Sequence, residues 1–213
     1  MRVKAKERYR NAVGDIIPSV TTVLDILAKP ALIRWANRMG LDGIDTNKYK
    51  DALADIGTLA HLLIICSLSD ELPEVDEFTP EQLRAAERCY AKFVDWEKRN
   101  PVTPLLVEHP LVSETYQYGG RLDLFCICND AFMLADFKTS GGIFPEMIYQ
   151  VAAYRQLLVE AGWHVQKAVI LRVGRDDREG ADEKILTEYE LDIGFQIFTR
   201  CLEIYKLTTK GKL

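Results

Sequence analysis

A predicted β-hairpin constrains this chain most, because its turn fixes which side chains face one another. Two apolar arms, 118–128 and 131–138, flank the dipeptide Asn129–Asp130, which is typical of a tight hairpin turn. If the loop is symmetric about that dipeptide, counting back along both arms places Asp123 directly opposite Asp136.

The charged residues of this hairpin gather on one face. Side chains alternate along a strand, so Asp136 and Lys138 share a face, and Asp123 joins them from the opposite arm. Like charges directly opposite each other destabilise a sheet, and charges inside an apolar hairpin are normally paired or bound to a metal. We therefore predict that the two carboxylates hold a cation. The alternative is a solvated Asp–Lys pair on an exposed face.

These side chains suit the hydrolysis of a phosphodiester. Mg²⁺ takes oxygen ligands, typically one or two carboxylates together with water and substrate phosphate. Lys138 would orient or help deprotonate the attacking water and offset phosphate charge. Gln150 and Tyr154 follow at i, i+4 on the next predicted helix and share a face that could hydrogen-bond the water, the lysine or a phosphate. Ordinary helix packing is the alternative for that pair.

The remaining sequence predicts helices first and a sheet afterwards. Helices are expected at 20–27 with Ser19 as N-cap, and at 30–39, 51–68, 80–98, 145–160 and 193–206. Strands are expected at 105–108, 111–116, in the two hairpin arms, and at 165–173 and 185–191. This order predicts the α/β class, with a mixed central β-sheet flanked by helices and an N-terminal helical elaboration. We expect one domain over 1–213, mainly helical over 1–100, where His61 lies, with the sheet core over 101–213.

Composition limits the class of protein and the cellular compartment that we expect. With 213 residues and 48% apolar content, the chain can bury a substantial core. No apolar run reaches the length of a membrane span and the N-terminus lacks a signal-peptide core, so no membrane partner is expected. Five scattered cysteines, an odd number, argue against a disulfide framework and indicate a reducing, cytoplasmic compartment.

The net charge of −5 gives no global attraction to nucleic acid, but it permits a local basic channel. An extended N-terminus would show one basic face, formed by Arg2, Lys4, Lys6, Arg8 and Arg10. That face is either a solvated edge that blocks aggregation or a contact for phosphates. Further candidates for phosphate contact are Arg121, which the hairpin register places opposite Lys138, and Arg172 and Arg175.

The same motifs resemble the RecB-like branch of the PD-(D/E)XK nuclease superfamily. The resemblance rests on three segments in order and at short spacing, 120–123, 136–140 and 150–154. Upstream, Gly57 to His61 resembles the helical G-x-x-x-H element of that branch, whose histidine is a metal ligand. The segment 18–24 and the helix with Trp35 resemble phage-type members, so the similarity covers most of residues 18–206.

The resemblance implies a restriction-endonuclease-like core and a metal-dependent DNA nuclease, most simply an exonuclease acting on DNA ends or single strands. It implies Mg²⁺ or Mn²⁺ held by His61, Asp123, Asp136 and the backbone carbonyl of Phe137. An acidic residue ahead of the Asp123 strand often completes the metal shell in this family. Glu108 and Glu114 both qualify, and Glu108 is favoured because it ends an apolar strand.

Two departures from the family limit the expected cofactors. Some relatives hold an iron–sulfur cluster with four cysteines, three of them near the C-terminus, whereas here only Cys201 lies there, so no cluster is expected. The chain has no G-x-x-x-x-G-K-[ST] loop, so no nucleotide is expected either. The alternatives are a structure-specific endonuclease with the same site and a catalytically silent DNA-end-binding subunit. A recombination or replication protein is the partner that such roles suggest.

Overall fold

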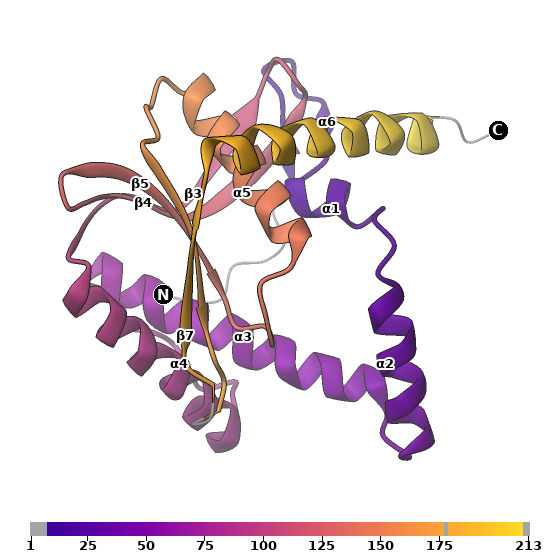
Figure 1. Ribbon diagram of the computed structural model, residues 1–213, viewed down its shortest axis with the longest axis vertical. Coiled ribbons are helices and arrows are strands. Elements are labelled where there is room, and N and C mark those ends of the chain that lie inside the picture. Colours follow the sequence, from indigo (N-terminus) through magenta and orange to yellow (C-terminus); the bar gives the residue numbers. More distant parts are fainter. Residues whose placement is uncertain (1–7, 177–178, 211–213) are drawn as a thin grey trace.

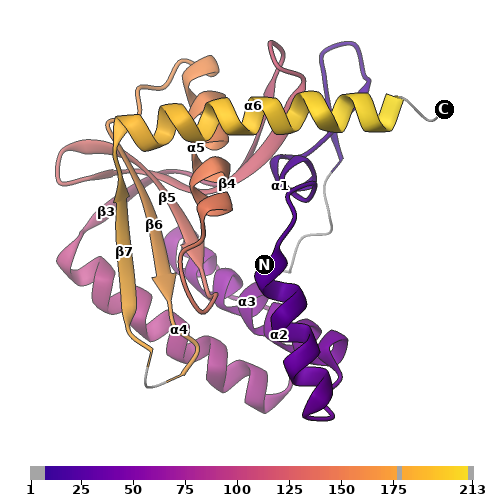
Figure 2. The same ribbon diagram turned by 45° about the vertical axis from the view of Figure 1, so that its right-hand side comes forward.

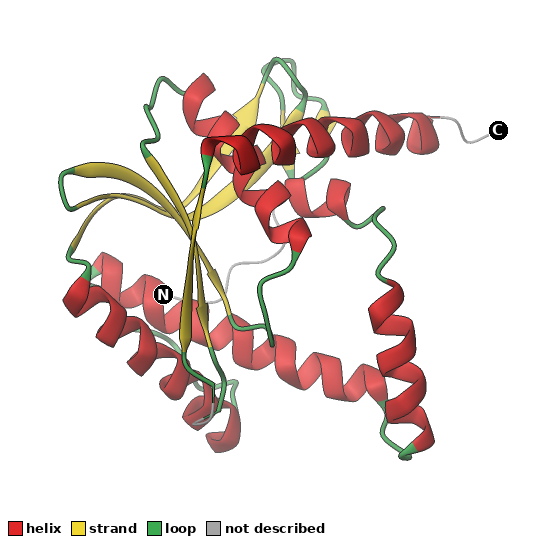
Figure 3. Cartoon of the chain, in the orientation of Figure 1, coloured by secondary structure: helices red, strands yellow, loops and turns green. Residues whose placement is uncertain are grey.

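A five-stranded mixed sheet forms the middle layer of the structure, a computed structural model that describes residues 8–176 and 179–210 (Figure 3). In spatial order its strands are β3 (Val102–Ser113), β4 (Tyr118–Cys128), β5 (Ala131–Lys138), β6 (Lys167–Val173) and β7 (Ala181–Leu186). Only β5 and β6 run parallel, and helix α5 (Pro145–Glu160) connects them. The predicted mixed α/β architecture with one crossover helix is confirmed.

Helices cover both faces of this sheet (Figure 1). The other helices are α1 (Val20–Leu24), α2 (Pro30–Leu41), α3 (Thr46–Ser69), α4 (Pro80–Arg99) and α6 (Glu188–Lys210). One apolar cluster packs α3 and α4 against the sheet around Phe93 and Phe137, and a second packs α1, α5 and α6 against the other face around Tyr118 and Phe198. A small hairpin of β1 (Tyr9–Arg10) and β2 (Ile16–Ile17) precedes α1.

The β4–β5 hairpin has the predicted register. Cys128 pairs with Ala131, and the ladder runs to the pair Leu124–Ala135. Asn129 and Asp130 have φ angles of 50° and 62°, which is the type I′ conformation that matches the twist of the two strands. The bounds of both arms, and those of α5, are as predicted.

Other boundaries differ from the prediction for local reasons. The expected strands 105–108 and 111–116 are one strand, β3, with an irregular residue at Glu108. The expected strand 185–191 is wrong: β7 ends at Leu186, and α6 begins at Glu188. The Thr187 hydroxyl accepts a hydrogen bond from the Glu190 N–H, and the Glu190 carboxylate accepts one from the Thr187 N–H. This reciprocal cap starts the helix there.

Helix α3 is long and apolar enough to cross a membrane, judged by length and composition alone. The expectation that no run reaches such a length is therefore wrong. The second half of α3, from Leu59 to Cys66, instead packs against α4 and the sheet in the protein core. This packing accounts for its apolar composition.

All five cysteines are buried thiols without a disulfide. Cys126 and Cys128 belong to the cluster beneath α3 and α4 and pack there as small apolar residues. The cytoplasmic location inferred from the cysteine pattern stays a prediction.

A glycine sets the distance between α3 and the end of β5. A Cβ atom at Gly57 would lie 2.9 Å from Thr139 Oγ1, whereas one at Gly40, in α2, would meet nothing within 4 Å. We expect Gly40→Ala to stabilise the fold by about 1 kcal/mol, since alanine favours helix. Gly57→Ala should instead destabilise it by about 1 kcal/mol, since the side chain forces α3 or Thr139 to move. Chemical denaturation of both variants measures this contrast, and equal stabilisation would contradict it.

Candidate metal centre

Three side chains from separate elements meet where α3 crosses the sheet. His61 comes from the middle of α3, Glu108 from β3 and Asp123 from β4, and one ligand atom of each lies within 4.8 Å of the others. His61 Nδ1 is 3.8 Å from Asp123 Oδ2. The structure thus brings His61 beside the hairpin carboxylates, as the resemblance implied.

The backbone changes direction at this point. Leu122 packs in the cluster under α5, whereas Leu124, two residues on, packs in the cluster under α3 and α4. In a regular strand these two side chains would share a face. Opposite them in β3, Glu108 has a φ of 46°, a left-handed conformation that is rare for a residue with a long side chain. Such local strain is found preferentially at functional sites.

Asp123 also marks the end of the β4–β5 ladder. Its Oδ2 accepts a hydrogen bond of 2.7 Å from the Phe137 backbone N–H. One step beyond the pair Leu124–Ala135, the predicted register puts Asp123 opposite Asp136. The ladder stops before this step, and the Asp123 side chain accepts the hydrogen bond from β5 in place of the β4 backbone. The ladder does not continue to the expected pairing of Arg121 with Lys138.

Asp136 and Lys138 form the second part of the site. Lys138 Nζ lies 2.5 Å from Asp136 Oδ2, and the Asp136 side chain is 1% exposed. Asp136 Oδ1 is fully buried and has no hydrogen-bond partner among the described residues. An orphaned carboxylate oxygen beside other oxygen and nitrogen donors is what a missing cation would leave.

Burial dominates the electrostatics. It raises the pKa of Asp136 to about 6 against the opposing effect of Lys138, and it also raises the pKa of Asp123. Burial and the Asp123 carboxylate raise the pKa of Glu108. Burial and the Lys138 charge lower the pKa of His61, which favours the neutral imidazole that binds metals. Desolvation works to lower the pKa of Lys138, but Asp136 and Asp123 outweigh it, so the pKa is raised and the lysine is charged.

The residues fit a divalent cation. His61, Glu108 and Asp123 would hold the cation, with Asp136 nearby. A hydrogen bond joins His61 to the Phe137 backbone and acts to raise the pKa of the imidazole. Carboxylate oxygens suit Mg²⁺ or Mn²⁺, and an imidazole nitrogen favours Mn²⁺. The second candidate acid, Glu114, lies elsewhere: its carboxylate accepts hydrogen bonds from the Ala12 N–H and the Gln117 amide.

The other predicted site residues surround this centre. Gln150 Nε2 donates a 2.9 Å hydrogen bond to the Tyr154 hydroxyl. Burial, together with the charges of Asp136 and Asp123, raises the pKa of Tyr154. A Cβ at Gly120 would collide with the Tyr154 ring at 2.6 Å, so this glycine makes room for it. Arg121 pairs with Glu108 at 3.4 Å.

The residues predicted to contact phosphate differ in their exposure and in their partners. Arg172 is buried and its guanidinium pairs with Asp182 at 2.6 Å, which holds β6 to β7. Arg175 is half-buried and donates a hydrogen bond to Thr139, the residue after Lys138. Arg8 and Arg10 are exposed on either side of the buried Tyr9. The remaining candidates, Arg2, Lys4 and Lys6, lie outside the described residues. Their roles stay predictions.

Comparison with solved structures finds proteins of similar fold. A candidate exonuclease from Eubacterium rectale superimposes with a TM-score of 0.52 at 9% identity, covering 74% of this chain and 69% of that one. An alkaline exonuclease from Laribacter hongkongensis gives a TM-score of 0.35 at 15% identity over 70% and 82% of the two chains, and its complex with dAMP gives 0.32. No protein-family model and no curated protein matches the sequence. The Eubacterium rectale structure shares the fold of this chain, which confirms the predicted fold class, and the PD-(D/E)XK nuclease superfamily stays a prediction.

Metal binding should stabilise the folded chain. A cation at one hundred times its dissociation constant adds about 2.7 kcal/mol. We expect Mn²⁺ to raise the melting temperature of the wild type, and Glu108→Gln or Asp123→Asn to remove that increase. Glu114→Gln is the matched control and should keep it. His61→Ala should weaken Mn²⁺ binding more than Mg²⁺ binding. An unchanged Mn²⁺ effect in Glu108→Gln would exclude this carboxylate as a ligand.

The buried Asp136 predicts an unusual pH dependence of stability without metal. Its pKa of about 6 exceeds that of an unfolded aspartate, so the folded state binds the proton more tightly. Stability should therefore fall as pH rises from about 4 to about 6 and stay lower above that range. Asp136→Asn should recover up to about 3 kcal/mol at pH above 7 and little at pH 4. Denaturation in chelator at both pH values tests this, and a pH-independent difference would contradict it.

Proposed function

We propose that the protein is a metal-dependent deoxyribonuclease that hydrolyses phosphodiester bonds. The observation that carries this proposal is the group of His61, Glu108 and Asp123 around one point, beside a buried Asp136 that contacts Lys138. The fold shared with an exonuclease structure supports it, although fold alone never fixes activity.

The residues divide the chemical work. His61, Glu108 and Asp123 would hold Mg²⁺ or Mn²⁺, which when bound lowers the pKa of water and stabilises charge on phosphate. Lys138, kept charged by Asp136, carries an ammonium to the same place, where it can orient the attacking water and offset the charge that develops on the phosphate. Gln150 donates a hydrogen bond to the Tyr154 hydroxyl, which lies within electrostatic reach of Asp136 and Asp123.

Arg121 has a position suited to the substrate. Its guanidinium pairs with Glu108 of β3, and the side chain is about one fifth exposed. In the sheet, β4 separates β3 from β5, the strand that carries Lys138. A scissile phosphate bound between Arg121 and Lys138 would meet a cation on each side. Cleavage of ends or single strands is the mode that we favour, and a structure-specific endonuclease is the second candidate because its site would be the same.

DNA topology distinguishes these modes. End-labelled linear DNA and covalently closed circular DNA are incubated with the protein in Mg²⁺ and in Mn²⁺. An exonuclease degrades the linear form alone, a structure-specific endonuclease also nicks a circle that carries an unpaired loop, and a silent DNA-binding subunit cleaves neither. Activity that survives EDTA would exclude the proposed mechanism.

Variants at the centre should separate metal binding from catalysis. Asp123→Asn and Asp136→Asn should abolish cleavage. Lys138→Ala should lower turnover by about 10²-fold or more while the Mn²⁺-induced rise in melting temperature persists, because the lysine acts on water or phosphate. Lys138→Arg should rescue poorly, since a planar guanidinium does not replace a compact ammonium. Loss of the Mn²⁺ effect in Lys138→Ala would contradict this assignment.

A further inference from the structure

Helix α2 leaves apolar surface uncovered. Leu32, Ile33 and Leu41 are 50%, 73% and 81% exposed. Figures 1 and 2 both show α2 beside the N-terminal end of α3, away from the sheet. Neither the sheet core nor the metal centre accounts for these side chains, so α2 is available for a ligand.

Two aromatic rings meet where α2 packs on α3. The centroids of Trp35 and Tyr49 are 6.0 Å apart and the ring planes are tilted by 45°. Tyr49 is 42% exposed, and Trp35 is half-buried. Rings held in place and still partly open to solvent can stack on a planar ligand.

The charge of α2 is entirely basic. Arg34 and Arg38 are exposed and lie one turn apart, and Arg38 is also three residues from Trp35, so these side chains are neighbours on the helix surface. The next acids along the chain, Asp42 and Asp45, lie at the turn between the two helices, where Asp45 caps α3. In a chain of net charge −5, this combination of aromatic and basic groups fits an anionic polymer with planar bases.

Arg175 lies between the end of β5 and the first turns of α3. Arg175 Nη2 donates to the hydroxyl of Thr139, which directly follows Lys138. Burial lowers the pKa of Arg175, and the Tyr49 phenol is near enough to act against this shift. Along α3, Tyr49 precedes His61 by three turns, or about 18 Å. A strand that leaves the centre past Thr139 and Arg175 therefore reaches Tyr49 and then Trp35.

We propose that α2 and the first turns of α3 bind a single DNA strand, with Trp35 and Tyr49 stacking on bases and Arg34 and Arg38 contacting phosphates. The inference rests on the proposed nuclease function and names its substrate as single-stranded DNA. A duplex hides the faces of its bases, so stacking selects the unpaired strand, whereas arginine–phosphate contacts act on both forms.

Binding is measured without cleavage, by fluorescence anisotropy in chelator with Asp136→Asn as the parent. The ligands are an oligothymidylate and a duplex of equal length. Trp35→Leu, which keeps an apolar side chain without a π face, should weaken single-strand binding about tenfold and duplex binding little. Trp35→Phe keeps a ring and should stay within about twofold of the parent. Tyr49→Leu removes the second ring from α3 and should act like Trp35→Leu.

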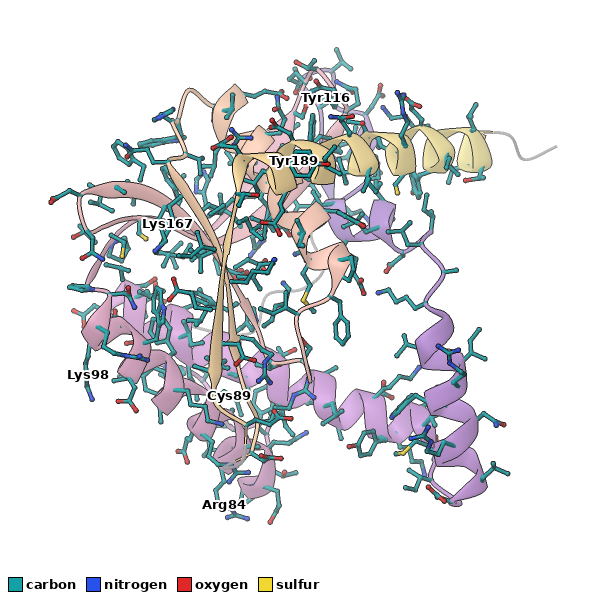
Figure 4. The ribbon with its side chains drawn as sticks, in the orientation of Figure 1. Arg84, Cys89, Lys98, Tyr116, Lys167 and Tyr189 are labelled. Atoms are coloured by element: carbon teal, nitrogen blue, oxygen red, sulfur yellow. The ribbon has the colours of Figure 1, made fainter. Side chains whose placement is uncertain are left out.

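The chain offers matched controls on α6. Tyr189 is 74% exposed and lies on α6, apart from α2 (Figure 4), so Tyr189→Ala should leave single-strand binding unchanged. Arg34→Gln and Arg38→Gln should each flatten the dependence of log affinity on log salt by about 0.7. Arg200→Gln, at an exposed arginine of α6 that pairs with Glu203, should not.

The outcomes separate the two proposals. Unchanged single-strand binding in Trp35→Leu and Tyr49→Leu, or an equal loss for duplex, would overturn the role of α2 even if the wild type cleaves DNA. Equal loss in Trp35→Leu and Trp35→Phe would also overturn it, because packing and not stacking would be at stake. Selective loss of single-strand binding supports it, and a wild type that cleaves no DNA would then refute only the nuclease function.

Discussion

The hydrogen bond from the Phe137 N–H to Asp123 is the contact on which the arrangement of the site depends. It ties β4 to β5 at the point where their backbone ladder stops, and it fixes a buried carboxylate that would otherwise have few partners. Because one oxygen of Asp123 is held by β5, the side chain stays close to His61 and Glu108. Lys138, two residues from Asp136 on the same strand, then pairs with the Asp136 carboxylate.

The two apolar layers make this concentration of charge tolerable. Buried carboxylates cost free energy, as the raised pKa values of Asp123, Asp136 and Glu108 show. The cost is offset by packing of α3 and α4 on one face and α1, α5 and α6 on the other. The left-handed conformation of Glu108 adds strain at the same place. A centre that is unfavourable without a cation is one that gains most when a cation neutralises it.

The site also explains why a long helical part precedes the sheet. Helix α3 carries His61 into the centre with its buried half and presents Tyr49 near α2 with its other half. The same helix thus links a ligand of the metal to the surface proposed for a single strand. Gly57 lets α3 approach Thr139, and Thr139 accepts a hydrogen bond from Arg175. The same residues therefore position both the metal centre and the proposed path of the DNA strand.

The sequence by itself determined the hairpin and which charged residues lie close together on it. Local turn geometry and strand alternation act over a few residues, so the pairing of Cys128 with Ala131 and the closeness of Asp136 to Lys138 followed from counting. Tertiary structure alone decided what depends on distant segments. The local pattern already favoured Glu108 over Glu114, and the packed structure brings Glu108 to His61 and Asp123. The pairing of Arg121 with Glu108 and of Arg172 with Asp182 follows from which strands become neighbours. No local pattern carries such information, because it arises only when the chain packs.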